Sequence, residues 1–141
     1  MENSQVVSNK IPIVFINYNR PDKTEIVLNA LSKCDGIEKC KVYAFSDAAP
    51  LDRPDNVEKV EEVRKILDSW KNKLDMEITH RSENFGCSKN VVYAVNQVFE
   101  KFEYCVYFED DTVPEKDFLD FMLPLLERYK DTENVFSIEA T

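Results

Sequence analysis

The strongest constraint on this fold is a short apolar run, IPIVFIN, that is followed closely by a helix signal. The run Ile11–Asn17 is almost continuously apolar, which is typical of a strand covered on both faces. Pro21 suits the first position of a helix, and Asp22 lies near the positive end of that helix. Four apolar residues would share one helical face: Ile26, Val27, Ala30 and Leu31. A doubly covered strand that leads into an amphipathic helix predicts a layered α/β fold.

The same alternation continues along the chain. Residues 41–47, KVYAFSD, predict a second strand, and residues 76–80, MEITH, alternate and predict a third strand at an edge. Between these strands Asp55 and Glu58 predict a capping box at the start of a helix. The apolar stripe of that helix consists of Val57, Val60, Val63, Leu67 and Trp70. Another helical face is predicted within residues 87–102, formed by Val91, Val92, Val95, Val98, Phe99 and Phe102.

The last third of the chain adds two strands and a helix to the prediction. Residues 104–110, YCVYFED, indicate a fourth strand, and residues 135–141, VFSIEAT, indicate the start of another. The helix predicted over residues 116–129 contains Pro124, which should kink or divide it. Strands that alternate with helices over short loops favour parallel pairing through right-handed crossovers. The predicted fold class is therefore an α/β three-layer sandwich with a mostly parallel sheet.

Composition excludes several classes of function. The chain has 141 residues, a formal net charge of -9 and no cluster of Lys and Arg, which argues against nucleic-acid binding. No apolar segment approaches the roughly 18 residues of a membrane span, and the N-terminal MENSQVVSNK does not resemble a signal peptide. We therefore expect a flexible leader at residues 1–10, one domain at residues 11–141 and a cytoplasmic location. Glycine-rich dinucleotide and P-loop motifs are absent, and a zinc site is disfavoured because the four cysteines form no Cys-x-x-Cys pair.

Three predicted strands end in polar residues, in the segments NYNRP, SDAA and EDDT. In open α/β sheets ligands bind outside the carboxyl ends of the strands, so these segments should share one edge. The acidic triplet Glu109, Asp110 and Asp111 is the strongest signal. Two carboxylates about 4 Å apart repel by roughly 4 kcal/mol at an effective dielectric near 20, so the triplet needs water, protonation or a cation. Mg²⁺ is typically bound by one or two carboxylates together with phosphates, so the triplet could hold such an ion. The structural alternative is a solvated turn whose acids favour the N-terminus of the following helix.

Other polar residues near these strand ends could contact a ligand. Asp47 could accept a hydrogen bond from a base N–H or could serve as a turn residue, and Arg20 could approach a phosphate or a base or lie on the surface. A polar loop that leads into the third predicted helix could attract an anion. Its residues are Asn84, Gly86, Ser88, Lys89 and Asn90. Gly86 suggests a backbone position with positive φ or a close approach.

Four ordered segments, IPIVFINYNRP, VYAFSDAA, NFGCSKNVVYAVNQVF and YFEDDTVPEKDFLDFMLPLLERY, resemble the donor-binding half of a GT-A fold glycosyltransferase. The last segment, with its DXD-like triplet, is most similar to the N-acetylglucosaminyltransferase I type. The resemblance implies that Asp111 binds Mn²⁺ or Mg²⁺, that Asp110 contacts the ribose and that Glu109 contacts the donor sugar. It also implies that Asp47 binds uracil and that Arg20 lines the nucleotide pocket. Lys89 and Asn90 match the family's donor-contacting residues only in part, because Lys89 is offset and Asn90 replaces a histidine.

The implied function is transfer of a sugar from a nucleotide-diphosphate sugar, with UDP as the expected nucleotide, to a glycan or other hydroxyl acceptor. Inverting enzymes of this fold carry a carboxylate general base beyond the metal motif, and we assign that role to no residue here, Glu139 included. We therefore expect a truncated domain that binds donor and is inactive alone. The alternatives are a nucleotidyltransferase of related fold, a phosphoacceptor signalling module and a non-catalytic nucleotide- or metal-binding module. A nucleotidyltransferase would carry a glycine-rich loop after the first strand, and a phosphoacceptor module would carry its paired acids there. Neither feature follows the first predicted strand of this sequence.

Overall fold

The fold is known from a computed structural model that describes residues 9–140. Strands and helices alternate along the chain, as the sequence predicts. The elements are β1 (Ile11–Asn17), α1 (Pro21–Ser32), the short 3-10 helix η1 (Ile37–Lys39), β2 (Cys40–Ser46), α2 (Asp55–Trp70), β3 (Met76–His80), α3 (Cys87–Phe99), β4 (Val106–Glu109) and α4 (Phe118–Tyr129). The leader predicted for residues 1–10 lies, apart from its last two residues, outside the described part of the chain.

The four strands form one parallel sheet in the order β3-β2-β1-β4. β1 lies inside the sheet, where Ile13 pairs with Val42 of β2 on one side and with Val106 of β4 on the other. Its run of buried residues agrees with the prediction of a doubly covered strand. β3 lies at an edge, as its alternating pattern predicts. The parallel pairing places the carboxyl ends of all four strands at one edge of the sheet.

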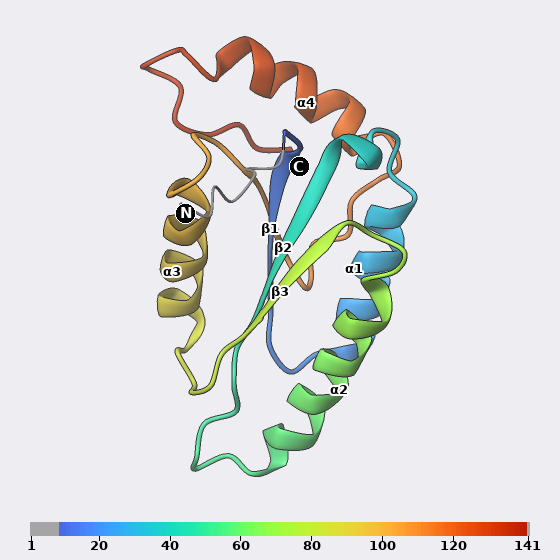
Figure 1. Cartoon of the computed structure of the whole chain (residues 1–141), viewed down its shortest axis with the longest axis vertical. Helices are drawn as coiled ribbons and strands as arrows, with labels where there is room; N and C mark the ends of the chain where they lie inside the picture. The colour runs from blue at the N-terminus through green and yellow to red at the C-terminus, as the bar shows by residue number, and fades with distance from the viewer. Residues whose placement is uncertain (1–8, 141) are drawn as a thin grey trace, which may run out of the picture.

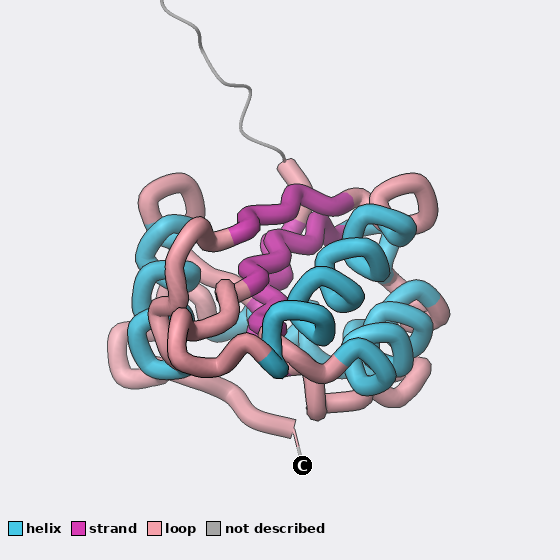
Figure 2. Tube along the Cα trace, turned by 90° about the horizontal axis from the view of Figure 1, so that it is seen from below, coloured by secondary structure: helices cyan, strands magenta, loops and turns pink. Residues whose placement is uncertain are grey.

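Helices cover both faces of the sheet, which confirms the predicted α/β class (Figure 1). Figure 2 looks from below the first view and shows the strands between a pair of helices, α1 and α2, and the single helix α3. The core under α1 and α2 is the larger and includes Phe15, Leu67 and Phe108. The core under α3 is smaller and includes Phe45 and Val98. Successive side chains of a strand thus point to opposite faces of the sheet, as pleated geometry requires.

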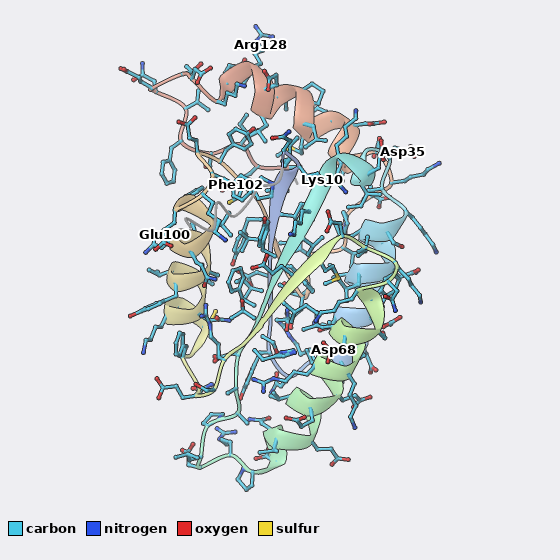
Figure 3. All side chains as sticks on the ribbon, viewed as in Figure 1. Lys10, Asp35, Asp68, Glu100, Phe102 and Arg128 are labelled. Carbon is cyan, nitrogen blue, oxygen red and sulfur yellow. The ribbon has the colours of Figure 1, made fainter. Side chains whose placement is uncertain are left out.

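α4 lies across the opposite edge of the sheet from the loops that follow β1, β2 and β3 (Figure 1). It buries Leu119 and Leu123 in the larger core. The backbone N–H of Asp35 donates to the carbonyl of Lys116 over 2.9 Å, which ties the segment before α4 to the end of α1, and Figure 3 shows Asp35 at this edge. Gly36 has φ 93°, a backbone conformation in which a side chain would be strained. The carboxyl edge is therefore left clear of α4.

Two local predictions differ from the structure. Asp55 is the first residue of α2 and Pro54 holds the capping position without a side-chain hydrogen bond, so the predicted capping box is wrong. The carbonyls of Arg53 and Pro54 accept the first helical N–H groups instead. Residues 135–140 form no strand, because apolar composition does not supply the neighbouring strand that a ladder requires. Pro124 lies within α4 without dividing it.

Candidate functional site

A pocket of about 290 Å³ opens at the carboxyl edge of the sheet. Its walls come from the ends of β1, β2 and β4 and from the start of α3. The lining residues are Ile16, Asn17, Tyr18, Asn19, Arg20, Asp47, Asn84, Gly86, Cys87, Asn90, Glu109 and Asp110. Five of the seven site residues predicted from the sequence are among them, whereas Lys89 and Asp111 are not. The strand ends that the sequence singles out therefore surround one cavity.

Asp47 is buried, with 3% of its surface exposed, and its carboxylate holds the loop before α3 in place. Oδ1 accepts hydrogen bonds from the backbone N–H groups of Ala48 at 2.9 Å and Phe85 at 2.8 Å. Oδ2 accepts from the backbone N–H of Gly86 at 2.9 Å and from the Asn84 side chain at 3.3 Å. A carboxylate has about four acceptor positions, and these four donors use them. An additional bond from a nucleobase would have to share or displace one of them.

Gly86 allows the chain to turn from this loop into α3. Its φ of 75° lies in the region that favours glycine, and a side chain there would meet no neighbour within 4 Å. The positive φ predicted from the sequence is thus present. Cys87 is the first residue of α3, and the side chain lies at the pocket. The α3 N-terminus consequently borders the cavity with its unpaired N–H groups.

Asn90 is 1% exposed and is held from two sides. Its side-chain oxygen accepts from Nε of Arg81 at 3.1 Å, and its amide nitrogen donates to the carbonyl of Phe45 at 3.4 Å. Arg81 is stacked over the rings of Phe45 and Phe85 at 5.3 Å and 4.7 Å from their centroids. Burial lowers the pKa of Arg81, and Asp47 opposes that shift. The sequence analysis did not select Arg81, although it directly follows β3, whose carboxyl end lies at the same edge of the sheet as the predicted site residues.

Arg20 forms a fork between two members of the acidic triplet. Its NH2 group donates to Oδ1 of Asp110, and its NH1 group donates to Oδ2 of Asp111 at 3.1 Å. The side chain of Asp111 is 45% exposed, whereas that of Asp110 is 3% exposed. Burial raises the pKa of Asp110, Arg20 opposes this shift and Asp111 adds to it. The repulsion expected within the triplet is therefore balanced here by a guanidinium.

Glu109 turns to a different partner. Its Oε1 accepts a hydrogen bond from the Tyr107 hydroxyl at 2.7 Å. Burial and this carboxylate together raise the pKa of Tyr107 well above its usual range. The three consecutive acids thus have three environments, because successive residues at a strand end point in different directions.

A row of buried polar atoms lies beneath the pocket. Both side-chain atoms of Asn17, Oγ of Ser46 and Oδ2 of Asp110 lack hydrogen-bond partners among the described residues. Asn17 pairs with Ser46 across β1 and β2, and it lines the pocket together with Asp110. Sequence reasoning did not single out Asn17, although a polar amide that closes a buried apolar strand is a signal that could have found it. Unpaired buried groups are rare, so these atoms favour a pocket that receives polar partners.

Lys89 lies outside the pocket lining. Its ammonium group is 4.4 Å from the centroid of Phe85 and 5.6 Å from that of Tyr93. This position covers the aromatic side of α3. A contact between Lys89 and a ligand in the pocket would require the lysine to leave these rings.

Within residues 9–140, no three His, Cys, Asp or Glu side chains are arranged as a metal-binding group. The donors nevertheless fit a divalent ion that receives most of its ligands from a diphosphate and water, because Mg²⁺ is often bound by one or two carboxylates. Asp111 offers an exposed carboxylate at the rim of the pocket, where it contacts the lining residue Arg20. Oδ2 of Asp110 is a second, buried oxygen without a partner in the described residues. These two carboxylates could therefore bind an ion together with a diphosphate and water, but they do not surround an ion by themselves.

Comparison with solved structures defines the class of fold: it is that of glycosyltransferase structures. Residues 1–349 of TarS from S. aureus match with a TM-score of 0.66 and 18% identity, over 93% of this chain and 38% of that one. The same protein in complex with UDP matches with a TM-score of 0.65 and 20% identity, over 85% of this chain and 32% of that one. The mannosyltransferase PcManGT from Pyrobaculum calidifontis, in complex with GDP-Man and Mn²⁺, matches with a TM-score of 0.60 and 19% identity, over 83% and 32%.

The chain spans about a third of the length of these three structures. No protein-family model and no curated protein matches its sequence. Among the helices that the structure describes, none has the length and apolar character needed to cross a membrane.

Proposed function

We propose that this chain is the nucleotide-sugar-binding part of a metal-dependent glycosyltransferase. The observation that carries the proposal is the pocket at the carboxyl edge, which combines a buried, incompletely paired Asp110 with Arg20 and Asp111 at its rim. The fold is shared with glycosyltransferases whose structures contain UDP, UDP-GlcNAc or GDP-Man with Mn²⁺. The reaction would transfer a sugar from a UDP-sugar to a glycan or other hydroxyl acceptor.

The proposed donor contacts fall into two groups. Arg20, Glu109 and Asp110 line the pocket, Arg20 with a side chain that is 41% exposed and Asp110 with an oxygen that has no partner among the described residues, which supports direct contact with diphosphate, sugar and ribose. Asp47 and Asn90 also line it, but their hydrogen bonds to the protein favour an additional role in shaping the base-binding wall. Lys89 would have to reorient to reach a phosphate. These proposed contacts rest on the resemblance to GT-A fold glycosyltransferases and, except for Lys89, on the position of the residues in the pocket.

Asp111 is the proposed ligand of Mn²⁺ or Mg²⁺. When bound, the ion would offset the negative charge that develops on the departing nucleoside diphosphate. The chain's own contribution is to hold Asp111 at the rim by its place after β4 and to exclude water around Asp110 by burial. The general base and the acceptor site are not assigned to any residue of this chain.

The finer assignment to the N-acetylglucosaminyltransferase I type rests on the order Glu-Asp-Asp at the end of β4. The observation of separate environments for these three acids supports a division of roles among them. A cytoplasmic location likewise remains a prediction from the sequence.

Titration calorimetry with UDP, in the presence and absence of Mn²⁺, tests the proposal. We expect UDP to bind with Mn²⁺ and to bind at least about tenfold more weakly without it, a difference of about 1.4 kcal/mol. Asp111→Asn should remove the effect of Mn²⁺. Asp131→Asn is the matched control, because Asp131 is exposed and follows α4 at the far end of the molecule. Equal binding with and without Mn²⁺, or full Mn²⁺ dependence in Asp111→Asn, would contradict the proposed site.

A non-catalytic binding module would give the same result in this titration, so a second measurement is needed. UDP release from a UDP-sugar, measured on the chain and on a longer protein that contains it, separates the two. Release by the longer protein alone supports the glycosyltransferase. Binding without release in either form would favour the non-catalytic module.

A further inference from the structure

We propose that Arg20 occupies the acidic motif in the metal-free protein and transfers to the diphosphate when a nucleotide binds, so that metal and nucleotide bind cooperatively. This inference rests on the proposed function and adds a mechanism of coupling to it. Arg20 would be a positioning residue for Asp110 and Asp111 as well as a contact to the nucleotide.

The geometry gives Arg20 two carboxylate partners at once. One arm of the guanidinium donates to Asp110 and the other donates to Asp111 at 3.1 Å. These residues are far apart in the chain but meet because β1 and β4 are neighbours in the sheet. Two adjacent carboxylates would otherwise repel each other. The guanidinium therefore offsets the negative charge of the two carboxylates, as a metal ion bound to the same oxygens would.

A metal ion alone has to compete with this arrangement. Arginine keeps its charge throughout the physiological range, so Arg20 can release Asp111 only by moving and not by losing a proton. A cation that approaches Asp111 without a nucleotide would meet the positive guanidinium and would leave Arg20 without its second partner. We therefore expect weak binding of free Mn²⁺.

A diphosphate changes this balance. The Arg20 side chain is 41% exposed and lines the pocket, so it has room to turn, whereas Asp110 is buried directly after β4. A phosphate group can accept two parallel hydrogen bonds from one guanidinium, as a single carboxylate can. The nucleotide thus supplies Arg20 with new partners and frees Asp111 for the ion. By linkage, each ligand then raises the affinity for the other by the same factor.

Manganese binding measured by electron paramagnetic resonance of free Mn²⁺ tests this coupling at constant ionic strength, with and without UDP. For the wild type we expect UDP to tighten Mn²⁺ binding by about tenfold or more. Arg20→Gln should bind Mn²⁺ alone several-fold more tightly than the wild type, and UDP should tighten its binding much less. Arg20→Lys keeps the charge but not the fork, so its affinity for Mn²⁺ alone should lie between the two. Arg128→Gln, at the far end of the molecule in Figure 3, should behave as the wild type.

The outcomes separate this inference from the function on which it rests. If Asp111→Asn abolishes Mn²⁺-dependent UDP binding while folded Arg20→Gln binds Mn²⁺ alone no more tightly than the wild type, the coupling role of Arg20 is wrong and the proposed function stands. If the wild type binds no Mn²⁺ with UDP present, both fail. A cooperative thermal transition confirms that each variant is folded. Should Arg20→Gln not fold, an Arg20→Lys protein with unchanged Mn²⁺ affinity would overturn the inference.

Discussion

Asp47 and Asp110 are two buried aspartates at the same edge of the sheet, with 3% and 2% of their surface exposed, but they are stabilised in opposite ways. Asp47 accepts four hydrogen bonds from uncharged donors, three of them backbone N–H groups. Asp110 is paired with the partly exposed side chain of Arg20, and its second oxygen has no partner among the described residues. One carboxylate is held by the backbone and the other by a side chain that can turn.

The difference separates a carboxylate that the fold needs from one that a ligand can use. Breaking the bonds of Asp47 would leave buried N–H groups of the loop before α3 unpaired, which is costly. The main contact that holds Asp110 is the side chain of Arg20, which can move to another anion, and the backbone of Tyr18 adds a smaller stabilising effect. Carboxylates that look alike in the sequence can therefore be ranked by whether their partners are fixed or movable.

The largest expected effect on stability is that of Asp47→Asn. The new amide group would face backbone N–H groups that need an acceptor, so we expect a loss of about 3 kcal/mol in the free energy of unfolding. Urea unfolding followed by circular dichroism measures it. Asp52→Asn is the matched control, since Asp52 is exposed in the loop between β2 and α2. A loss in Asp47→Asn no larger than in this control would remove the distinction between the two aspartates.

Asp110→Asn should change stability much less. Its carbonyl oxygen can still accept from Arg20, whose partly exposed guanidinium can also be solvated. Because burial disfavours the charged form, we expect the variant to match or slightly exceed the wild type at neutral pH, within about 1 kcal/mol. UDP affinity in the presence of Mn²⁺ should fall at the same time. A large loss of stability would instead assign Asp110 to the fold.

The pH dependence of stability sharpens this point. The pKa of Asp110 is raised, first by burial and then by Asp111, against the opposing effect of Arg20. The folded protein thus keeps this proton to a higher pH than the unfolded chain, whose pKa is about 3.9. The contribution of Asp110 is favourable at low pH and is lost as pH rises through the folded pKa. The wild type should accordingly lose stability relative to Asp110→Asn as pH rises from about 3.5 in a series of urea titrations; a constant difference would contradict the shift.

The smallest effect on stability is expected for Asp111→Asn. The Asp111 side chain is 45% exposed, and surface ion pairs contribute little, so the free energy of unfolding should change by less than about 0.5 kcal/mol. The same variant should lose Mn²⁺-dependent UDP binding. Thermal melts and the UDP titration on one preparation compare the two effects directly. A clear loss of stability would mean that the acidic motif also serves the fold.

The sequence predicts the alternation of strands and helices, and with it the gathering of strand ends at one edge, because both follow from local periodicity and the handedness of crossovers. It does not predict the fork of Arg20, since that contact depends on β4 pairing with β1, and strand order is a property of the whole sheet. For a similar reason the four bonds to Asp47 and the support of Asn90 by Arg81 could not be foreseen. They arise where loops meet after the sheet has assembled.

The sheet order also bears on how this molecule folds. Ile13 of β1 pairs with Val42, but its other partner is Val106, which lies much further along the chain. Closing that longer loop costs more chain entropy, and contacts between distant segments form slowly. β4 has four residues, and within the described chain β1 is the strand with which it pairs. The strand that carries the acidic motif is therefore expected to dock late during folding and to detach early, so a diphosphate that binds Arg20 and, through a metal ion, Asp111 would also stabilise the attachment of this short strand to β1.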